Sequence, residues 1–171
     1  MEITVDTSKL HLPKGNEINI ATQRALNHTF KKAVTAGNRA VTRKWNIKLK
    51  ELKSYIHLKK ATRNRLEAEI KVKSRSISLA HFGARQIKKG VSYKLRKDMG
   101  RKTLRHAFIA TTKNGYVGVF TRKTKKRLPL NTFKSITPSS MYAKESIDAI
   151  NEVMNRDFAD RFRHELSRIE R

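Results

Sequence analysis

The chain of 171 residues carries 40 Lys and Arg against 14 Asp and Glu, a formal net charge of +26, and no cysteine. The missing cysteine excludes disulfide scaffolds, thiolate zinc sites and cysteine nucleophiles. The first twelve residues do not form a signal peptide, and no apolar run is long enough to span a bilayer, so we expect assembly in the cytosol without a membrane.

The positive charge is concentrated in the middle of the chain. Residues 31–140 contain 31 bases and four acids, whereas residues 1–30 and 141–171 are almost balanced. A surface of one sign repels itself, so we expect a polyanion or an acidic protein as its partner.

The first third of the chain predicts a strand and two helices. Ile3 and Val5 alternate with polar residues, which favours a short strand. We therefore interpret residues 1–15 as an N-terminal strand or arm. Apolar residues then recur every three or four positions over residues 18–45, which predicts a long amphipathic helix. Gly37 and Asn38 could kink or split this helix. Asn46 is expected to cap a short helix that reaches Ile56.

The centre of the chain predicts strands. Residues 66–72 alternate, and after Ser74–Ser76 the apolar phase shifts, which predicts a turn and more strand over residues 77–79. Residues 91–95 alternate weakly and favour an edge strand. Two β-prone runs joined through Asn114 and Gly115 predict a tight hairpin.

Residues 147–169 have helical apolar spacing and i,i+4 charge pairs, which predict a C-terminal helix. The expected fold class is therefore α+β. A long N-terminal helix and a C-terminal helix should pack on one face of a small, mainly antiparallel sheet, in one domain of residues 1–171.

The sequence offers little for catalysis. The six histidines have no metal-ligating spacing, and the dispersed glycines form no phosphate-binding loop. Glu67 and Glu69, with His81 or His106, could imitate a metal nuclease site, but the polar face of a strand produces the same pattern. We expect no enzyme activity, no catalytic or metal-binding residues and no cofactor.

Two basic clusters in predicted loops are the candidate contacts for DNA or for an acidic partner. Such loops neutralise phosphates without reading bases. The first cluster precedes the strand at residues 66–72 and the second follows the hairpin; together they comprise Lys59, Lys60, Arg63, Arg65, Arg122, Lys123, Lys125, Lys126 and Arg127.

Three segments carry a family resemblance. They are ISLAHFGARQIKKGVSYKL from Ile77, GRKTLRHAFIATTKNGYVGVFTR from Gly100, and KKRLPL from Lys125, followed by a turn at Pro138 and Met141. In these segments the chain resembles the minor tail protein Z family, the tail completion proteins of lambda-like bacteriophages. It departs from the family pattern at NTFKSITPSS, which lacks an expected glycine near Lys134.

The resemblance implies a structural virion protein that completes the head-proximal end of a phage tail and helps to position the DNA end for ejection. The implied partners are the tail terminator, the head–tail connector and double-stranded DNA bound without sequence preference. Tail tubes are six-fold symmetric, so a homohexameric ring is expected. The candidate subunit or neighbour interface is Leu128, Pro129, Leu130 and Phe133. The alternative is a free, sequence-nonspecific nucleic-acid-binding protein.

Overall fold

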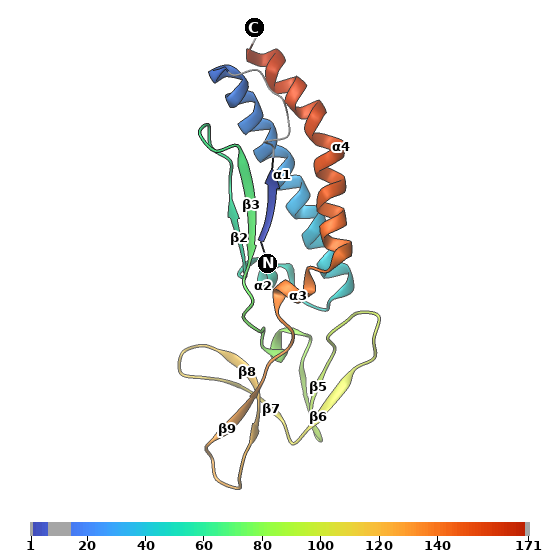
Figure 1. Cartoon of the computed structure of the whole chain (residues 1–171). Coiled ribbons are helices and arrows are strands. Elements are labelled where there is room, and N and C mark those ends of the chain that lie inside the picture. The colour runs from blue at the N-terminus through green and yellow to red at the C-terminus, as the bar shows by residue number, and fades with distance from the viewer. Residues whose placement is uncertain (1, 7–14, 170–171) are drawn as a thin grey trace.

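A computed structural model describes residues 2–6 and 15–169, the side chains of residues 2–6 excepted. The molecule is elongated, with two long helices at one end and small sheets at the other (Figure 1). We call residues 77–137 the β region. The rest of the described chain is the helical region.

Two long helices pack side by side along the helical region. Helix α1 spans Asn16–Lys44 and helix α4 spans Lys144–Ile169, close to the ranges that the apolar spacing predicts. Their contact is the most extensive between any two elements of the described chain. From α1, Leu26 and Phe30 are buried in the main core, and Ile150 and Met154 enter that core from α4.

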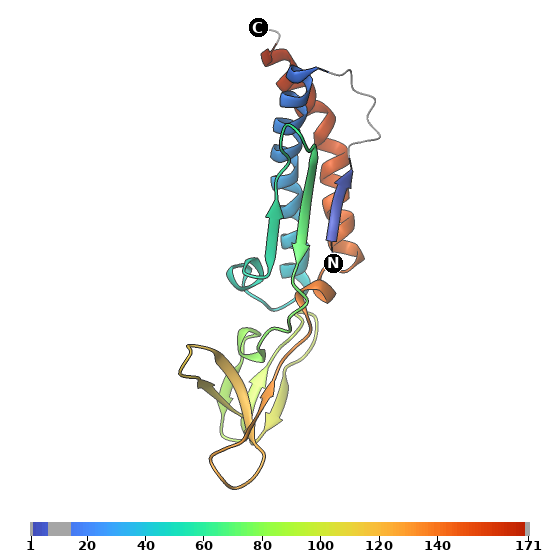
Figure 2. The same ribbon diagram turned by 60° about the vertical axis from the view of Figure 1, so that its left-hand side comes forward.

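A three-stranded antiparallel sheet lies along α1 (Figure 2). Its strands are β1 (Glu2–Asp6), β2 (Ile56–Lys59) and β3 (Glu67–Val72), in the order β1-β3-β2. The N-terminal strand and the strand at residues 66–72 are thus confirmed. Ala68, Ile70 and Val72 of β3 are buried in the main core.

The β region holds two further antiparallel sheets. One consists of β4 (Arg85–Ile87), β5 (Gly90–Tyr93) and β6 (Lys102–Arg105), and the other of β7 (Phe108–Thr111), β8 (Val117–Arg122) and β9 (Leu130–Phe133). The 3-10 helix η1 (Leu79–His81) precedes them, and the short helix α3 (Pro138–Met141) follows. The fold class is α+β as predicted, but the described strands form three sheets rather than one. The long helices lie along the first sheet and leave the other two uncovered (Figure 1).

Gly37 and Asn38 do not interrupt α1. Helix α1 is continuous there because both residues are packing positions. A Cβ atom on Gly37 would lie 2.7 Å from two side-chain carbons of Ile150, so glycine permits the close approach of α4. Asn38 is buried and its Oδ1 accepts a hydrogen bond from the hydroxyl of Tyr142.

The predicted cap at Asn46 is wrong. Helix α2 is only Leu49–Lys53 and begins after Lys48, while Ile56 starts β2. The amide of Asn46 has a different partner, because its Nδ2 donates to the carbonyl of Lys94 at 3.0 Å. Asn46 therefore joins the two regions instead of capping a helix.

Two strand predictions also need correction. Residues 77–79 do not continue a strand, since Ser78 forms an isolated bridge with Lys134 before η1 begins. Strand β5 is the centre of its sheet rather than an edge, because β4 and β6 flank it and Val91 is fully buried.

The hairpin of β7 and β8 is confirmed, with a longer turn than a two-residue loop. Thr112 and Gly115 close the turn through a 2.9 Å backbone hydrogen bond, and Gly115 has a φ of 74°. This is the arrangement of a three-residue hairpin loop, in which glycine supplies the left-handed residue.

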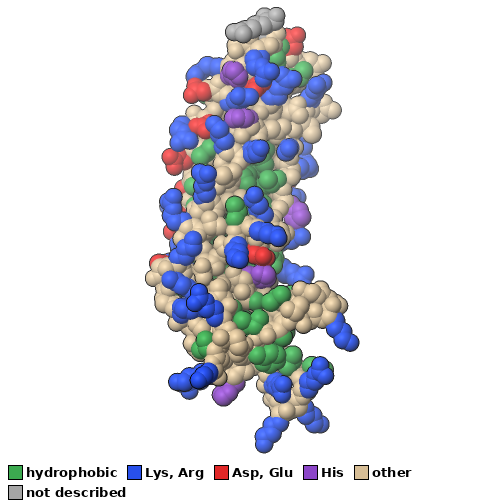
Figure 3. All heavy atoms as spheres, turned by 180° about the vertical axis from the view of Figure 1, so that it is seen from behind, with side chains coloured by type: hydrophobic (Ala, Val, Ile, Leu, Met, Phe, Trp, Pro, Cys, Tyr) green, Lys and Arg blue, Asp and Glu red, His purple; other side chains and the backbone are tan. Residues whose placement is uncertain are grey.

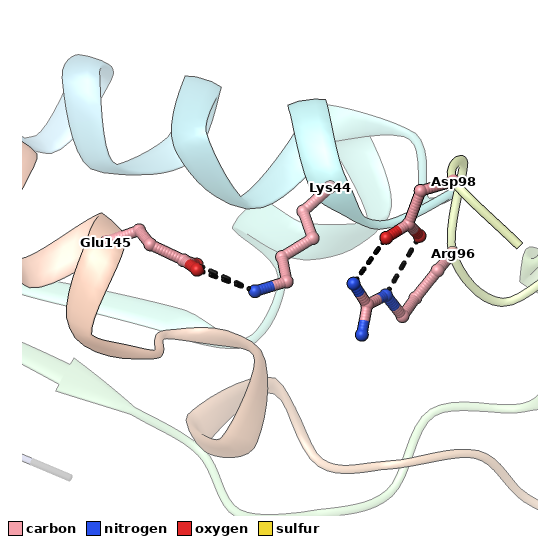
Figure 4. Close-up of polar contacts among 4 residues, drawn as sticks. All are labelled: Lys44, Arg96, Asp98 and Glu145. Carbon is pink, nitrogen blue, oxygen red and sulfur yellow. Dashed lines mark hydrogen bonds and ion pairs between the residues drawn. The ribbon is translucent and has the colours of Figure 1, made fainter.

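The joint between the regions is held on two sides. Chain segments that enter and leave the β region pair through Ser135 N and Ile77 O at 2.7 Å. On the other side, Asn46 N donates to the carbonyl of Leu95 at 2.8 Å. Figure 4 shows two ion pairs beside this joint, Lys44–Glu145 between the helices and Arg96–Asp98 in the β5–β6 loop.

Candidate nucleic-acid interface

The two predicted basic clusters lie at opposite ends of the molecule. The first is on the β2–β3 hairpin, beside the long helices, and the second is on the β8–β9 loop at the far end of the β region (Figure 1). The fold therefore does not bring them onto one surface. One compact ligand cannot contact both clusters on the same copy of the chain.

The basic cluster on the β2–β3 hairpin is exposed, but one of its side chains already forms a local ion pair. Arg63 is at the tip of the hairpin, between Thr62 and Arg65, whose backbones exchange hydrogen bonds of 2.8 and 3.2 Å. The guanidinium of Arg65 pairs with the carboxylate of Glu67 at 2.7 Å. Lys59 and Lys60 are exposed at the end of β2.

The β8–β9 loop presents its cations without a nearby acid in the sequence. Arg122, Lys123, Lys125, Lys126 and Arg127 are all exposed. The loop is closed at its base, where Lys123 N donates to the carbonyl of Pro129 at 3.2 Å. The Arg122 guanidinium lies 6.0 Å from the ring centroid of Phe108, a cation–π arrangement. Four cations thus extend from a closed loop, and Arg122 lies beside it at the end of β8.

The predicted interface residues divide into two kinds. Leu128 is 65% exposed and Pro129 is also exposed at the base of the loop. Leu130 begins β9 opposite Arg122, and Phe133 packs against the smaller core. The structure leaves Leu128 and Pro129 as the accessible apolar part of this set.

The clusters chosen from sequence omit a basic hollow at the β4–β5 turn. Lys88 and Lys89 form this turn, and Arg105 and His106 complete a hollow of about 440 Å³. His106 has a φ of 57°, and its backbone N–H donates to the carbonyl of Lys89 at 3.1 Å. The adjacent lysines were visible in the sequence, but the approach of Arg105 depends on the pairing of β5 with β6.

The whole β region is nearly free of acids. Its 61 residues contain 16 Lys and Arg and a single acid, Asp98. A hydrogen bond from Arg96 lowers the pKa of the Asp98 carboxyl, so this acid is already occupied by a local cation. Figure 3 shows Lys and Arg side chains at the ends of both segments that project from this end of the molecule.

The residues of the nuclease hypothesis are dispersed. Glu69 is buried and pairs with Lys71 at 2.8 Å, and His81 faces Glu51 at 3.3 Å. His106 lies in the β6–β7 turn. Among the described side chains, no three of His, Cys, Asp or Glu are grouped as metal ligands.

The molecule is a basic α+β protein, and the family comparison defines its class as phage tail proteins. The family model for prophage minor tail protein Z matches residues 7–171. The chain belongs to that family, whose members are structural tail proteins of bacteriophages. No curated protein and no solved structure matched the chain. Within the described part of the chain, no helix has the length and apolarity to cross a membrane.

Proposed function

We propose that this protein completes the head-proximal end of a phage tail, as a homohexameric ring at the head–tail junction that helps to position the DNA end for ejection. Its neighbours there are the tail terminator and the head–tail connector, and it has no enzymatic role. Membership of the minor tail protein Z family supports the tail assignment. The observation that carries the DNA role is the β region, with its 16 bases and one acid.

The charge of the β region favours a polyanion as its ligand. Each phosphate that a Lys or Arg neutralises releases condensed counterions, and this contribution to binding does not depend on base sequence. Six copies of a region with a net charge of +15 would surround a channel with strong positive potential. That potential lowers the cost of holding a DNA end near the channel.

Imaging of intact particles tests the location. A six-fold ring of this protein next to the tail terminator, with the β8–β9 loops turned to the channel, is the expected result. Density for the protein at the distal end of the tail, or its absence from particles, would contradict the proposal. Absence from particles would favour the free nucleic-acid-binding alternative.

Charge reversal tests the role of the β8–β9 loop. In the triple variant Lys123→Glu, Lys125→Glu, Lys126→Glu the domain should fold, since exposed substitutions usually change stability by within about 0.5 kcal/mol. Tails should still join heads, but the particles should eject DNA poorly. The control Lys59→Glu, Arg63→Glu reverses exposed charges on the β2–β3 hairpin at the opposite end of the molecule.

The same experiment separates DNA contact from docking on an acidic neighbour. If the loop docks on such a neighbour, the variant should stay out of particles and accumulate free in lysates. Particles with the normal amount of the variant and wild-type infectivity would refute both roles.

A further inference from the structure

An open groove runs between α1 and β2, remote from the β8–β9 loop. It has a volume of about 630 Å³. Phe30 and Val34 line it from α1, and Ile56 and Leu58 line it from β2. Leu58 is 48% exposed, which is unusual for a leucine on the core-facing side of a strand. The groove therefore has an apolar floor, of which Leu58 and Ile56 are the accessible part.

The strand beside the groove has an open edge. In the order β1-β3-β2, only one side of β2 is paired among the described strands. Lys73 N donates to Tyr55 O, so the hydrogen-bonded pairs of this ladder are Tyr55–Lys73, His57–Lys71 and Lys59–Glu69. The N–H and C=O groups of Ile56 and Leu58 consequently point away from β3, toward the open edge.

The rim of the groove is positive. Lys31, Lys53 and Lys60 line it together with His28, and the described residues that line it include no acid. A segment that enters the groove therefore gains from negative charge and from apolar side chains.

The β2–β3 hairpin at one end of the groove is held against α1 by hydrogen bonds. The Asn27 side chain makes two hydrogen bonds of 2.9 Å with the backbone of Ala61, one as donor and one as acceptor. Gln23 Nε2 also donates to the Ala61 carbonyl, at 3.2 Å. These contacts hold the β2–β3 hairpin against α1, so a ligand does not have to order the site.

We propose that the open edge of β2 binds an extended acidic segment of a neighbouring protein, which adds to the sheet as a further strand. Its backbone pairs with Ile56 and Leu58, its alternate apolar side chains enter the groove, and acids at its two ends meet the lysines of the rim. Strand addition obtains affinity from main-chain hydrogen bonds and specificity from side-chain pockets. Duplex DNA fits less well, because it has no strand edge to pair and no apolar side chains for the floor.

Substitution of Leu58, which lies on the open edge of β2, gives the most specific test. Leu58→Pro removes an N–H that points away from β3, so the internal ladder stays intact while the edge is blocked. Leu58→Ala leaves the edge open and removes only the side chain. The triple variant Lys31→Gln, Lys53→Gln, Lys60→Gln removes only the charge.

The probe is a ten-residue peptide with a centre of alternating Val and Ser and two Glu at each end, and the control peptide has Lys in place of each Glu. In amide NMR spectra of the full chain, the Glu peptide should shift the signals of Ile56 and Leu58. Leu58→Pro should weaken its binding at least tenfold, and Leu58→Ala and the lysine triple variant should each weaken it severalfold. Circular dichroism checks that every variant folds.

Three results with the peptides would overturn the proposal. They are no shift at β2 with the Glu peptide, equal binding of the Lys peptide, and wild-type binding by the variants that fold. Should Leu58→Pro not fold, Leu58→Ala and the lysine triple variant decide the outcome. A short DNA duplex that shifts the β2 amides more than the Glu peptide does would also count against it. The β8–β9 loop is remote from this groove, so the two proposals can be tested separately. DNA binding by the loop can be disproved without affecting the groove proposal, and peptide binding in the groove can be disproved without affecting the DNA proposal.

Discussion

The helical region and the β region stabilise themselves differently. The main core of 17 buried residues lies mostly in the helical region, whereas the smaller core of the β region contains Leu79, Val91, Ala107 and Val119. Outside residues 77–137 the sequence has 24 bases and 13 acids, against 16 and one inside. The chain thus separates the part that carries packing and paired charge from the part that carries unbalanced charge.

This separation has a physical reason. Burial of apolar area supplies most of the folding free energy, and unbalanced charge opposes a compact state. A region with little core and almost no acid relies on attachment to the rest of the molecule. Substitutions in the helical region should therefore affect stability, and those in the β region should affect binding.

The largest expected effect concerns DNA binding by the β region. The purified triple variant Lys123→Glu, Lys125→Glu, Lys126→Glu should bind random duplex DNA far more weakly, and the slope of log K against log salt should fall by up to about 2.7. Reversal of Lys59, Lys60 and Arg63 should change the slope less. Fluorescence anisotropy across salt concentrations measures both. Equal slopes for the two variants would contradict the distinction between the regions.

The largest stability effect should come from Glu165 of α4. Its carboxylate is buried and forms ion pairs with Arg161, with Arg168 at 3.7 Å and with Arg24 of α1 at 3.9 Å. Glu165→Ala removes the charged acceptor that these cations share and should cost about 1.5–3 kcal/mol of unfolding free energy. Chemical denaturation measures this cost. The exposed Glu152→Ala on the same helix is the control and should change stability by less than about 0.5 kcal/mol.

Substitution of Gly37 tests the difference between the two regions through the packing of α1 against α4. Gly37→Ala gains helix propensity but forces Ile150 to move, and the net cost should be about 1–2 kcal/mol. In a double-mutant cycle with Ile150→Ala, the two changes should be less than additive by about 1 kcal/mol. Gly100→Ala in the β region meets no atom within 4 Å and should be almost neutral. Additive effects in the cycle would show that the two residues do not compete for one space.

The buried hydroxyl of Tyr142 should have a smaller effect. Burial raises the pKa of Tyr142, so its hydroxyl stays protonated and donates to Asn38 at every pH of interest. Tyr142→Phe leaves the Asn38 oxygen without this donor and should cost about 1 kcal/mol. Tyr116→Phe in the β region, where the side chain is 37% exposed, should not change the denaturation midpoint.

The smallest effect concerns pH. Burial, with help from Arg161 and Lys32, lowers the pKa of His28 below its usual 6.5. The unfolded chain therefore binds this proton more readily, and the stability contribution of neutral His28 is lost as pH falls below about 6.5. His28→Gln should flatten the pH dependence of the midpoint slightly between pH 6.5 and 5, with no change in slope at pH 8. A steeper dependence in the variant would contradict this sign.

Much of the helical region is predictable from local pattern. The apolar spacing of α1 and α4 and the alternation of β3 are long enough to identify each element. The sequence does not predict strands β2, β4, β6 and β9, because they have three or four residues, mostly exposed, and depend on pairing with β3, β5 or β8. Gly37 was misread because its role depends on Ile150, more than one hundred residues away.

The candidate binding surfaces are likewise only partly predictable from the sequence. Residue composition identifies the basic clusters, but only the fold separates them to opposite ends of the molecule. The groove beside β2 had no local signal, since its two walls come from α1 and β2. Helical spacing in α1 does not reveal which part of its apolar face stays accessible.

The attachment of the β region has a mechanical consequence. Two parallel links, one through Ser135 and Ile77 and one through Asn46 and the β5–β6 loop, remove the single axis about which the region could swivel. We therefore expect a force on the β8–β9 loop to be transmitted to α1 instead of being absorbed by bending at the joint. Tension on a ligand bound at the far end of the molecule should then act on the helices.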